Sequence, residues 1–250
     1  MGLRQYYLGL AAQPAPVGPP VLTPLPTAGL FARWKAGEGM TLSGNQVAGW
    51  TDSVSGLVAY QPTAAWRPVY DAAGLNGQPG LLFNGSLLQV DGLNLSDTQQ
   101  LTVALVLRLD NNGTHILLEH SPNYNGVQSA WLLYRDLEGS TPATQAAVLL
   151  AGGYGRVLNP GPASAPHVTV WTVDTATAPM YRLDLNESSV LPPVEYGATN
   201  VPFVNQPLFI GARAGLVAPM SGVISEILVY KQAYTDRTQL KQSLYDTYAI

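Results

Sequence analysis

The sequence predicts an all-β protein built from two stacked antiparallel sheets. The chain contains 25 glycines and 20 prolines among its 250 residues, which is typical of a protein with many turns. Charged residues make up only 11% of the chain and hydrophobic residues 46%, so a large core can form. Short β-branched or aromatic runs, bounded by Gly, Pro, Asn and Asp, recur through the second half of the chain.

Seven segments have the length and composition of strands. They are, in chain order, residues 101–109, 130–135, 145–153, 167–175, 180–186, 207–213 and 222–231. Several of them are apolar on both faces, which is typical of strands covered on two sides. MYRLDLN instead alternates Tyr181 and Leu183 with Arg182 and Asp184, as a strand with one exposed face does. Two stacked sheets satisfy both patterns.

The end of the chain is expected to be helical. After Asp236, the residues Leu240, Leu244 and Tyr248 recur every four positions, which is the spacing of one helix face. Asp236 and Gln239 are placed like a capping box at the start of such a helix. We expect this helix to pack on the sandwich.

Composition divides the chain into an arm, residues 1–27, and one domain, residues 28–250. Residues 5–32 carry no charged side chain, and residues 13–26 contain six prolines, so this part should run extended. Ordering it costs about 1 to 2 kcal/mol per residue, which burial of apolar side chains must offset. We expect the arm to lie on a neighbouring polypeptide. The alternatives are that it is a stiff spacer or that it lies on its own domain. The anchoring side chains would be Tyr6, Tyr7, Leu8, Leu10, Val17, Val21, Leu22 and Leu25.

Charge and composition argue against several classes of function. The net charge of −4, with scattered Lys and Arg, gives no basic surface for nucleic acid. No apolar run reaches 18 residues, so we expect no membrane span. The start of the chain makes a poor signal peptide, and Tyr6 stands where a myristoylation motif needs Ser or Thr. The chain has no cysteine and so no disulfide.

Between residues 50 and 90 the chain reads WTDSVSG, YQPTAAWRP and GLNGQPGLLFNGSLLQV. This ordered set resembles the laminin-G-like, concanavalin A-like jelly-roll domains of bacteriophage structural proteins and bacterial surface proteins. The matching residues are Trp50, Asp52, Ser55, Gly56, Gln61, Arg67, Pro68, Asn76, Gly77, Pro79, Phe83 and Gly85. HVTVWTVD, PLFIGAR and the last 29 residues resemble later parts of such domains, so the resemblance covers about residues 28–250. Asn84 stands where Asp is usual.

The resemblance implies a concanavalin A-like β-sandwich and, for function, a phage virion protein. Such a protein would be capsid decoration, a head fibre or a tail-associated protein. Its arm would anchor it to other virion proteins. We expect a homo-oligomer on the outer surface of the capsid or tail. The alternative is a carbohydrate-binding module of a tail fibre or bacterial surface protein, which recognises host glycans. Glycines at turns and core aromatics explain most of the matching residues, so the motif argues for fold more than for function.

Catalysis and metal binding find little support in the sequence. A glycosidase of this fold needs two carboxylates on one face of a strand, and the Glu-x-Asp-x-x-Glu string of related glucanases is absent. We therefore expect no enzyme and no catalytic residue. In HILLEH, His115 and Glu119 should share a face and His120 should point the other way, which argues against a metal site. Loop oxygens of DNNG, residues 110–113, could hold calcium, but a turn is expected; we predict no cofactor.

Two segments rich in aromatic and amide side chains are the candidate sugar-binding loops. They are residues 120–128, with Asn123, Tyr124 and Asn125, and residues 151–161, with Tyr154 and Arg156. Aromatic faces stack on the C–H groups of sugars while amides and Arg satisfy the hydroxyls. Contacts between subunits or plain turns are the alternatives.

Overall fold

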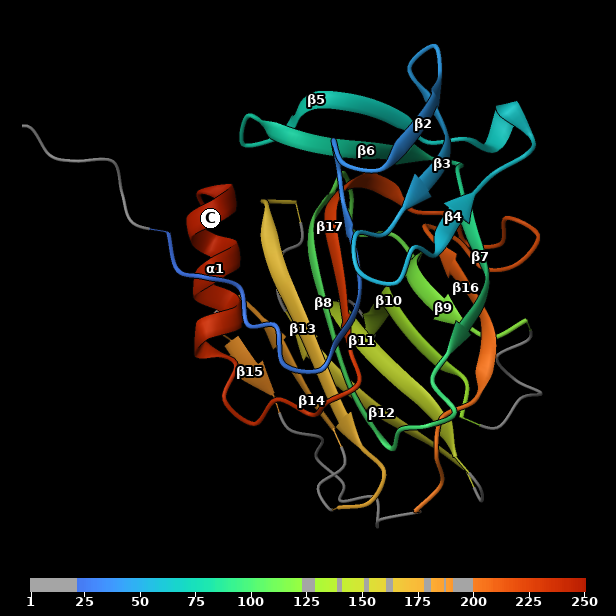
Figure 1. Cartoon of the computed structure of the whole chain (residues 1–250). Helices are drawn as coiled ribbons and strands as arrows, with labels where there is room; N and C mark the ends of the chain where they lie inside the picture. The colour runs from blue at the N-terminus through green and yellow to red at the C-terminus, as the bar shows by residue number, and fades with distance from the viewer. Residues whose placement is uncertain are drawn as a thin grey trace, which may run out of the picture.

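A computed structural model describes residues 22–122, 129–138, 141–150, 153–160, 164–177, 181–186, 188–190 and 200–250. These residues form an all-β sandwich of antiparallel strands with one short helix near the C-terminus (Figure 1). The predicted fold class is confirmed, and a strand overlaps each of the seven segments that the sequence predicts.

The first sheet, here called the helix-side sheet, has the central order β15–β14–β13–β8–β17. The outer edge of β17 pairs with two different strands, β1 along one half and β6 along the other, and β5 continues from β6. The strands are β1 (Leu30–Lys35), β5 (Val69–Leu75), β6 (Gln78–Asn84), β8 (Gln100–Leu109), β13 (His167–Asp174), β14 (Tyr181–Leu185), β15 (Ser188–Val190) and β17 (Ser221–Tyr230).

The second sheet, here called the far sheet, has the order β2–β3–β4–β7–β16–β9–β10–β11–β12. One bridge between Gln46 and Val69 joins it to the helix-side sheet at the β3–β5 edge. A 3-10 helix, η1 (Ala64–Trp66), follows β4. The strands are β2 (Met40–Ser43), β3 (Gln46–Thr51), β4 (Val58–Tyr60), β7 (Leu88–Asn94), β9 (His115–His120), β10 (Trp131–Glu138), β11 (Thr141–Leu150), β12 (Gly153–Pro160) and β16 (Asn205–Ile210).

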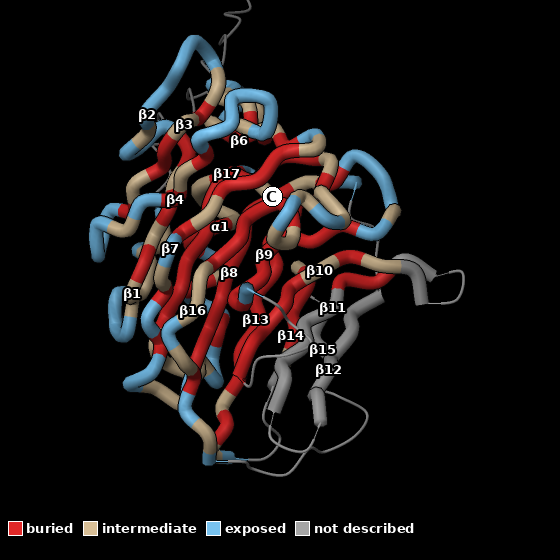
Figure 2. The backbone as a smooth tube through the Cα atoms, turned by 90° about the vertical axis from the view of Figure 1, so that its right-hand side faces the viewer, coloured by how far each residue is buried: buried red, intermediate tan, exposed pale blue. Residues whose placement is uncertain are grey.

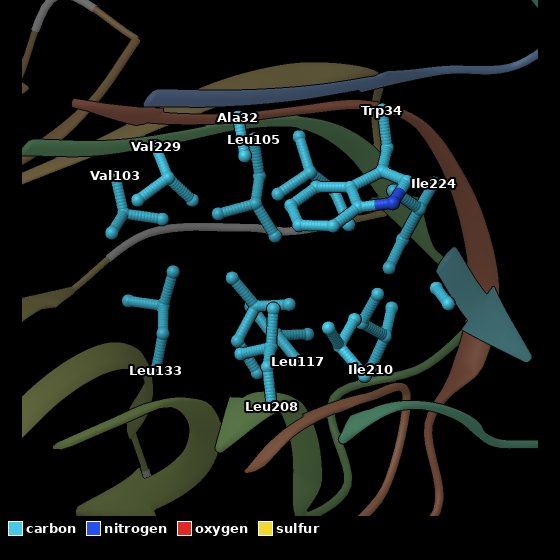
Figure 3. Close-up of a cluster of buried hydrophobic side chains, with 14 of the residues drawn as sticks. Ala32, Trp34, Val103, Leu105, Leu117, Leu133, Leu208, Ile210, Ile224 and Val229 are labelled. Atoms are coloured by element: carbon cyan, nitrogen blue, oxygen red, sulfur yellow. The ribbon is translucent and has the colours of Figure 1, made fainter. Parts of the chain in front are cut away.

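The main core lies between the two sheets. Figure 3 shows Val103, Leu105 and Val229 of the helix-side sheet facing Leu117 and Leu133 of the far sheet. All five side chains are fully buried. Burying one such side chain stabilises the fold by about 1.5 to 3 kcal/mol, so this layer contributes strongly to stability.

The helix α1 (Thr238–Tyr248) covers the other face of the helix-side sheet. Leu240, Leu244 and Tyr248 are buried there, as the four-residue spacing predicts, in a cluster that includes Val106 and Val170. This second layer explains why β8 and β13 are apolar on both faces. None of the described helices is long and apolar enough to cross a membrane.

The start of α1 differs from the expected capping box. The helix begins at Thr238, whose N–H donates to Asp236 Oδ1 at 2.9 Å, so Asp236 does satisfy one backbone donor. The Gln239 amide, however, donates to the carbonyl oxygen of Pro24 at 3.1 Å. The expected reciprocal bond is therefore replaced by a tertiary contact that local sequence cannot indicate.

Residues 22–28, here called the stem, lie along α1 and lead into β1 (Figure 1). Four hydrogen bonds hold the stem: the Thr23 N–H to Asp246 Oδ2 at 2.8 Å, Gln239 Nε2 to the Pro24 carbonyl at 3.1 Å, the Tyr230 hydroxyl to the Pro26 carbonyl at 3.1 Å, and the Tyr234 hydroxyl to the Ala28 carbonyl at 2.6 Å. Leu25 packs against the α1 cluster, whereas Leu22 is 53% exposed. Residues 1–21, and with them Tyr6, Tyr7, Leu8, Leu10, Val17 and Val21, lie outside the described residues.

Residues quoted for the family resemblance have structural roles. Asp52 accepts hydrogen bonds from the N–H groups of Val54 and Ser55 and from the Ser55 hydroxyl, each at 2.8 Å, and so fixes the turn after β3. Gln61 donates to the Leu87 carbonyl at 3.1 Å. Arg67 donates in turn to the Gln61 carbonyl at 2.7 Å. These bonds tie the loop after β4 to its neighbours, so these motif residues build the fold.

Candidate functional site

The histidine-rich strand β9 does not have the side-chain arrangement that simple alternation predicts. Leu118 pairs with Leu133, but Ile116 pairs with Tyr134, so one extra residue forms a bulge in β9. A bulge shifts the alternation by one position. His115 therefore lies opposite Arg135, on the same face as Leu133, and the prediction that His115 and Glu119 share a face is wrong.

The polar groups of this strand are engaged within the fold. Glu119 is buried and accepts from Arg213 Nε at 3.1 Å. His120 Nε2 lies 2.9 Å from the Leu93 carbonyl, and His115 Nε2 lies 2.8 Å from Asn111 Oδ1. Asn111 also accepts the Gly113 N–H at 2.8 Å, which makes DNNG a turn. Among the described residues, no group of three or more His, Asp or Glu side chains is placed to hold a metal ion.

The described parts of the two predicted sugar-binding segments approach one end of the far sheet. Asn123, Tyr124 and Asn125 are outside the described residues, but their segment begins where β9 ends, at His120. Across the sheet, His120 of β9 pairs with Trp131 of β10, Trp131 pairs with Val148 of β11, and Val148 pairs with Gly155 of β12. The end of β11 and the start of β12 therefore lie at the same end of the sheet as the end of β9.

The described part of the second segment, residues 153–160, is a strand and not a loop. Tyr154 and Arg156 belong to β12, where their backbones pair with Leu149 and Ala147. Glycine has low β-propensity, so the four glycines of this segment predict a loop. Pairing with β11 overrides that propensity in the described residues. The structure thus places Tyr154 and Arg156 in a strand, and it does not describe their side chains.

A second bulge, in β7, creates a polar site that the sequence analysis did not single out. Val90 pairs with Leu208 and Leu93 pairs with Gln206, so Asp91 and Gly92 together lie opposite Pro207. Proline donates no backbone hydrogen bond and is tolerated in a sheet at such a position. The bulge keeps Val90 and Leu93 in the core and leaves Asp91 exposed on the outer face of the far sheet.

Three side chains form a hydrogen-bonded group around this bulge. The Tyr60 hydroxyl donates to Asp91 Oδ1 at 2.6 Å, and Gln89 Nε2 donates to the same oxygen at 3.1 Å. Tyr60 and Gln89 are paired across β4 and β7, so they share a face. The hydrogen bond to Asp91 raises the pKa of Tyr60 above its ordinary value, which keeps the phenol protonated as the donor.

Asn205, at the start of β16, completes the group. A Cβ at position 92 would lie 3.0 Å from Asn205 Oδ1, so glycine there allows this amide to approach β7 closely. Asn205 and Asp91 are exposed, and Tyr60 and Gln89 are partly exposed. We call these four residues the bulge site. They combine one aromatic ring with a carboxylate and two amides, and Figure 2 views the side of the molecule on which β4, β7 and β16 lie.

The neighbouring part of the outer face is covered. Gln89 pairs with Phe209. Phe209 belongs to an apolar cluster with Leu87, which precedes β7, and with Ala212 and Leu216, which follow β16. This apolar cluster therefore adjoins Gln89 of the bulge site. Local sequence offered one signal for the site, namely Asp-Gly inside a strand, but its partner Pro207 lies far along the chain.

Comparisons with known proteins show the fold. No family model and no curated protein matches the sequence. Among solved structures, this chain is similar to domain 4 of AbnA, a GH43 extracellular arabinanase from Geobacillus stearothermophilus, in complex with arabinotriose. The identity is 14% and the TM-score 0.56, and the match covers 86% of this chain and 98% of that domain. Trypanosoma rangeli sialidase in complex with sialic acid is similar at 14% identity and a TM-score of 0.57, over 90% of this chain. The match spans 35% of the sialidase, so this chain corresponds to about a third of that protein.

Proposed function

We propose that this protein is a carbohydrate-binding domain and that the bulge site contacts the sugar. The observation that carries the proposal is the grouping of a partly exposed tyrosine ring with Asp91 and two amides on one rigid sheet face. A ring of this kind can stack on the C–H face of a sugar, while the carboxylate and amides accept and donate hydrogen bonds to hydroxyls. Because strands and a bulge hold the group, little ordering is needed on binding.

The fold supports this proposal. The arabinanase domain of similar fold was solved with arabinotriose, and this chain covers nearly all of that domain. A sandwich of this kind can therefore act as a separate sugar-binding unit. No catalytic role is proposed, since Glu119, on the same face, is buried and ion-paired with Arg213.

The test is a glycan array followed by calorimetric titration of the best oligosaccharide. Tyr60→Ala should weaken binding about tenfold, which corresponds to about 1.4 kcal/mol. Val58→Ala is the matched control, because Val58 is 44% exposed on the same short strand. Thermal unfolding of each variant reports on its fold. Equal binding by wild type and Tyr60→Ala, or an array with no bound glycan, would contradict the proposal.

A second candidate function is that of a phage virion protein, as the family resemblance implies, attached through the arm that composition predicts at residues 1–27, of which residues 1–21 precede the stem. The stem favours it, because four hydrogen bonds fix the direction from which the uncharged, proline-rich segment reaches the domain. In this proposal homo-oligomers project the sandwich outward from the capsid or tail, and the bulge site faces host glycans. Deletion of residues 1–21 should leave the domain folded and abolish its incorporation into particles. Normal incorporation of the truncated protein would show that the arm is not the anchor.

A further inference from the structure

We infer that the bulge site selects neutral sugars, which it binds through their hydroxyl donors, and discriminates against acidic sugars. This inference rests on the proposed sugar-binding function and specifies its ligand. It follows from two features of the site, namely which hydrogen-bonding atoms are already used and which charges surround it.

Two unused oxygens of the site, Asp91 Oδ2 and Gln89 Oε1, are acceptors. Asp91 Oδ1 already accepts two hydrogen bonds, from Tyr60 and from Gln89. These bonds hold the carboxylate through Oδ1 and leave Asp91 Oδ2, which receives no hydrogen bond from any described residue, available to a ligand. One of the two N–H groups of Gln89 Nε2 donates to Asp91, so the amide keeps one donor beside its acceptor oxygen. Hydroxyl groups, which donate, suit this set.

The only charged side chain of the bulge site is acidic. β4, β7 and β16 contain one acidic residue, Asp91, and neither Lys nor Arg. Of the arginines on adjoining segments, Arg213 is ion-paired with Glu119, whereas Arg67 donates to the carbonyls of Gln61 and Pro62 and keeps its positive charge. An acidic sugar placed over the Tyr60 ring would bring its carboxylate near Asp91, the one charged side chain of the bulge site.

The size of the discrimination follows from the charge pair. Two like charges about 4 to 6 Å apart in a largely aqueous setting repel enough to weaken binding about 5- to 10-fold. Since the site is exposed, salt screens this effect, and the discrimination should shrink as ionic strength rises. Replacing Asp91 by Asn removes the charge and keeps the shape of the side chain.

The experiment measures binding of wild type and Asp91→Asn to an array of neutral and acidic oligosaccharides, and titrates lactose, arabinotriose and α2,3-sialyllactose at low and high salt. Wild type should prefer neutral members, and Asp91→Asn should reduce the neutral-to-acidic ratio about 5- to 10-fold. Asp97→Asn is the control, because Asp97 is an exposed carboxylate that pairs with Lys231, so it changes the net charge equally. Thermal unfolding confirms that both variants fold.

The outcomes separate this inference from the proposed function. Preference of wild type for acidic glycans would overturn the inference while supporting sugar binding. An equal change of the ratio in Asp91→Asn and Asp97→Asn would also overturn it, because net charge and not the bulge site would then set the preference. If no glycan of either class binds, the proposed function fails and the inference fails with it.

Discussion

Two buried histidines should make this protein sensitive to mild acid. His120 ends β9, where its ring stacks on Trp131 with centroids 5.3 Å apart and its Nε2 donates to the Leu93 carbonyl at 2.9 Å. His167 begins β13, and its Nδ1 donates to the Ala165 carbonyl at 2.9 Å. Burial disfavours the charged imidazolium and lowers the pKa of each side chain from 6.5 to about 4.

The sign and size of the effect follow from linkage. A histidine whose pKa is depressed in the folded state is protonated more readily in the unfolded chain. Its contribution to stability is therefore present above pH 6.5 and is lost as the pH falls from 6.5 toward 4. The complete loss is about 3 kcal/mol for each histidine, of which about 2 kcal/mol is already lost at pH 5.

The perturbation is replacement of His120 and His167 by Gln, singly and together. Glutamine can still donate to the backbone carbonyl but does not titrate. Urea unfolding at pH 7 and pH 5 gives the drop in unfolding free energy for each protein. Each single variant should show a drop about 2 kcal/mol smaller than that of wild type, and the double variant a drop about 4 kcal/mol smaller. Any constant cost of the substitution cancels, since each protein is compared with itself.

The reasoning is refuted if the double variant loses as much stability between pH 7 and pH 5 as wild type does. In that case the histidines would have ordinary pKa values in the folded state, and acid sensitivity would come from the carboxylates alone.

Three further predictions test the packing. Leu105→Ala should lower the unfolding free energy by about 2 to 5 kcal/mol, because Leu105 is fully buried between the sheets. Urea denaturation measures this loss, and a loss below about 1 kcal/mol would contradict the two-sheet core. Gly222→Ala should prevent a stable fold, because a Cβ on Gly222, whose φ is +156°, would collide with the Arg108 carbonyl. Thermal unfolding tests this, and a wild-type melting temperature would disprove the collision. Tyr248→Phe should lower the unfolding free energy, measured by urea denaturation, by about 1 to 3 kcal/mol, because the Tyr248 hydroxyl donates to the buried Glu226 carboxylate at 2.8 Å. An unchanged urea midpoint would show that water replaces this bond.

Local pattern is sufficient for the regular parts of this fold. The apolar run at residues 101–109 predicts a strand, and β8 covers Gln100–Leu109. The recurrence of Leu240, Leu244 and Tyr248 predicts the face that α1 buries. In both cases the same physics acts at short range, since backbone geometry sets the period and the apolar side chains occupy one or both faces.

The sequence alone therefore determined the all-β class, the paired apolar layers and the closing helix. Only the tertiary structure decided the polar geometry, namely the bulge that moves His115 to the other face of β9 and the bulge that exposes Asp91. A bulge exists only relative to a partner strand, and β16, the partner of β7, lies far away in the sequence. For the same reason Gln239 was expected to close its own helix and instead binds Pro24 of the stem. Periodicity fixes which residues are apolar together, whereas register between distant segments fixes which polar side chains meet.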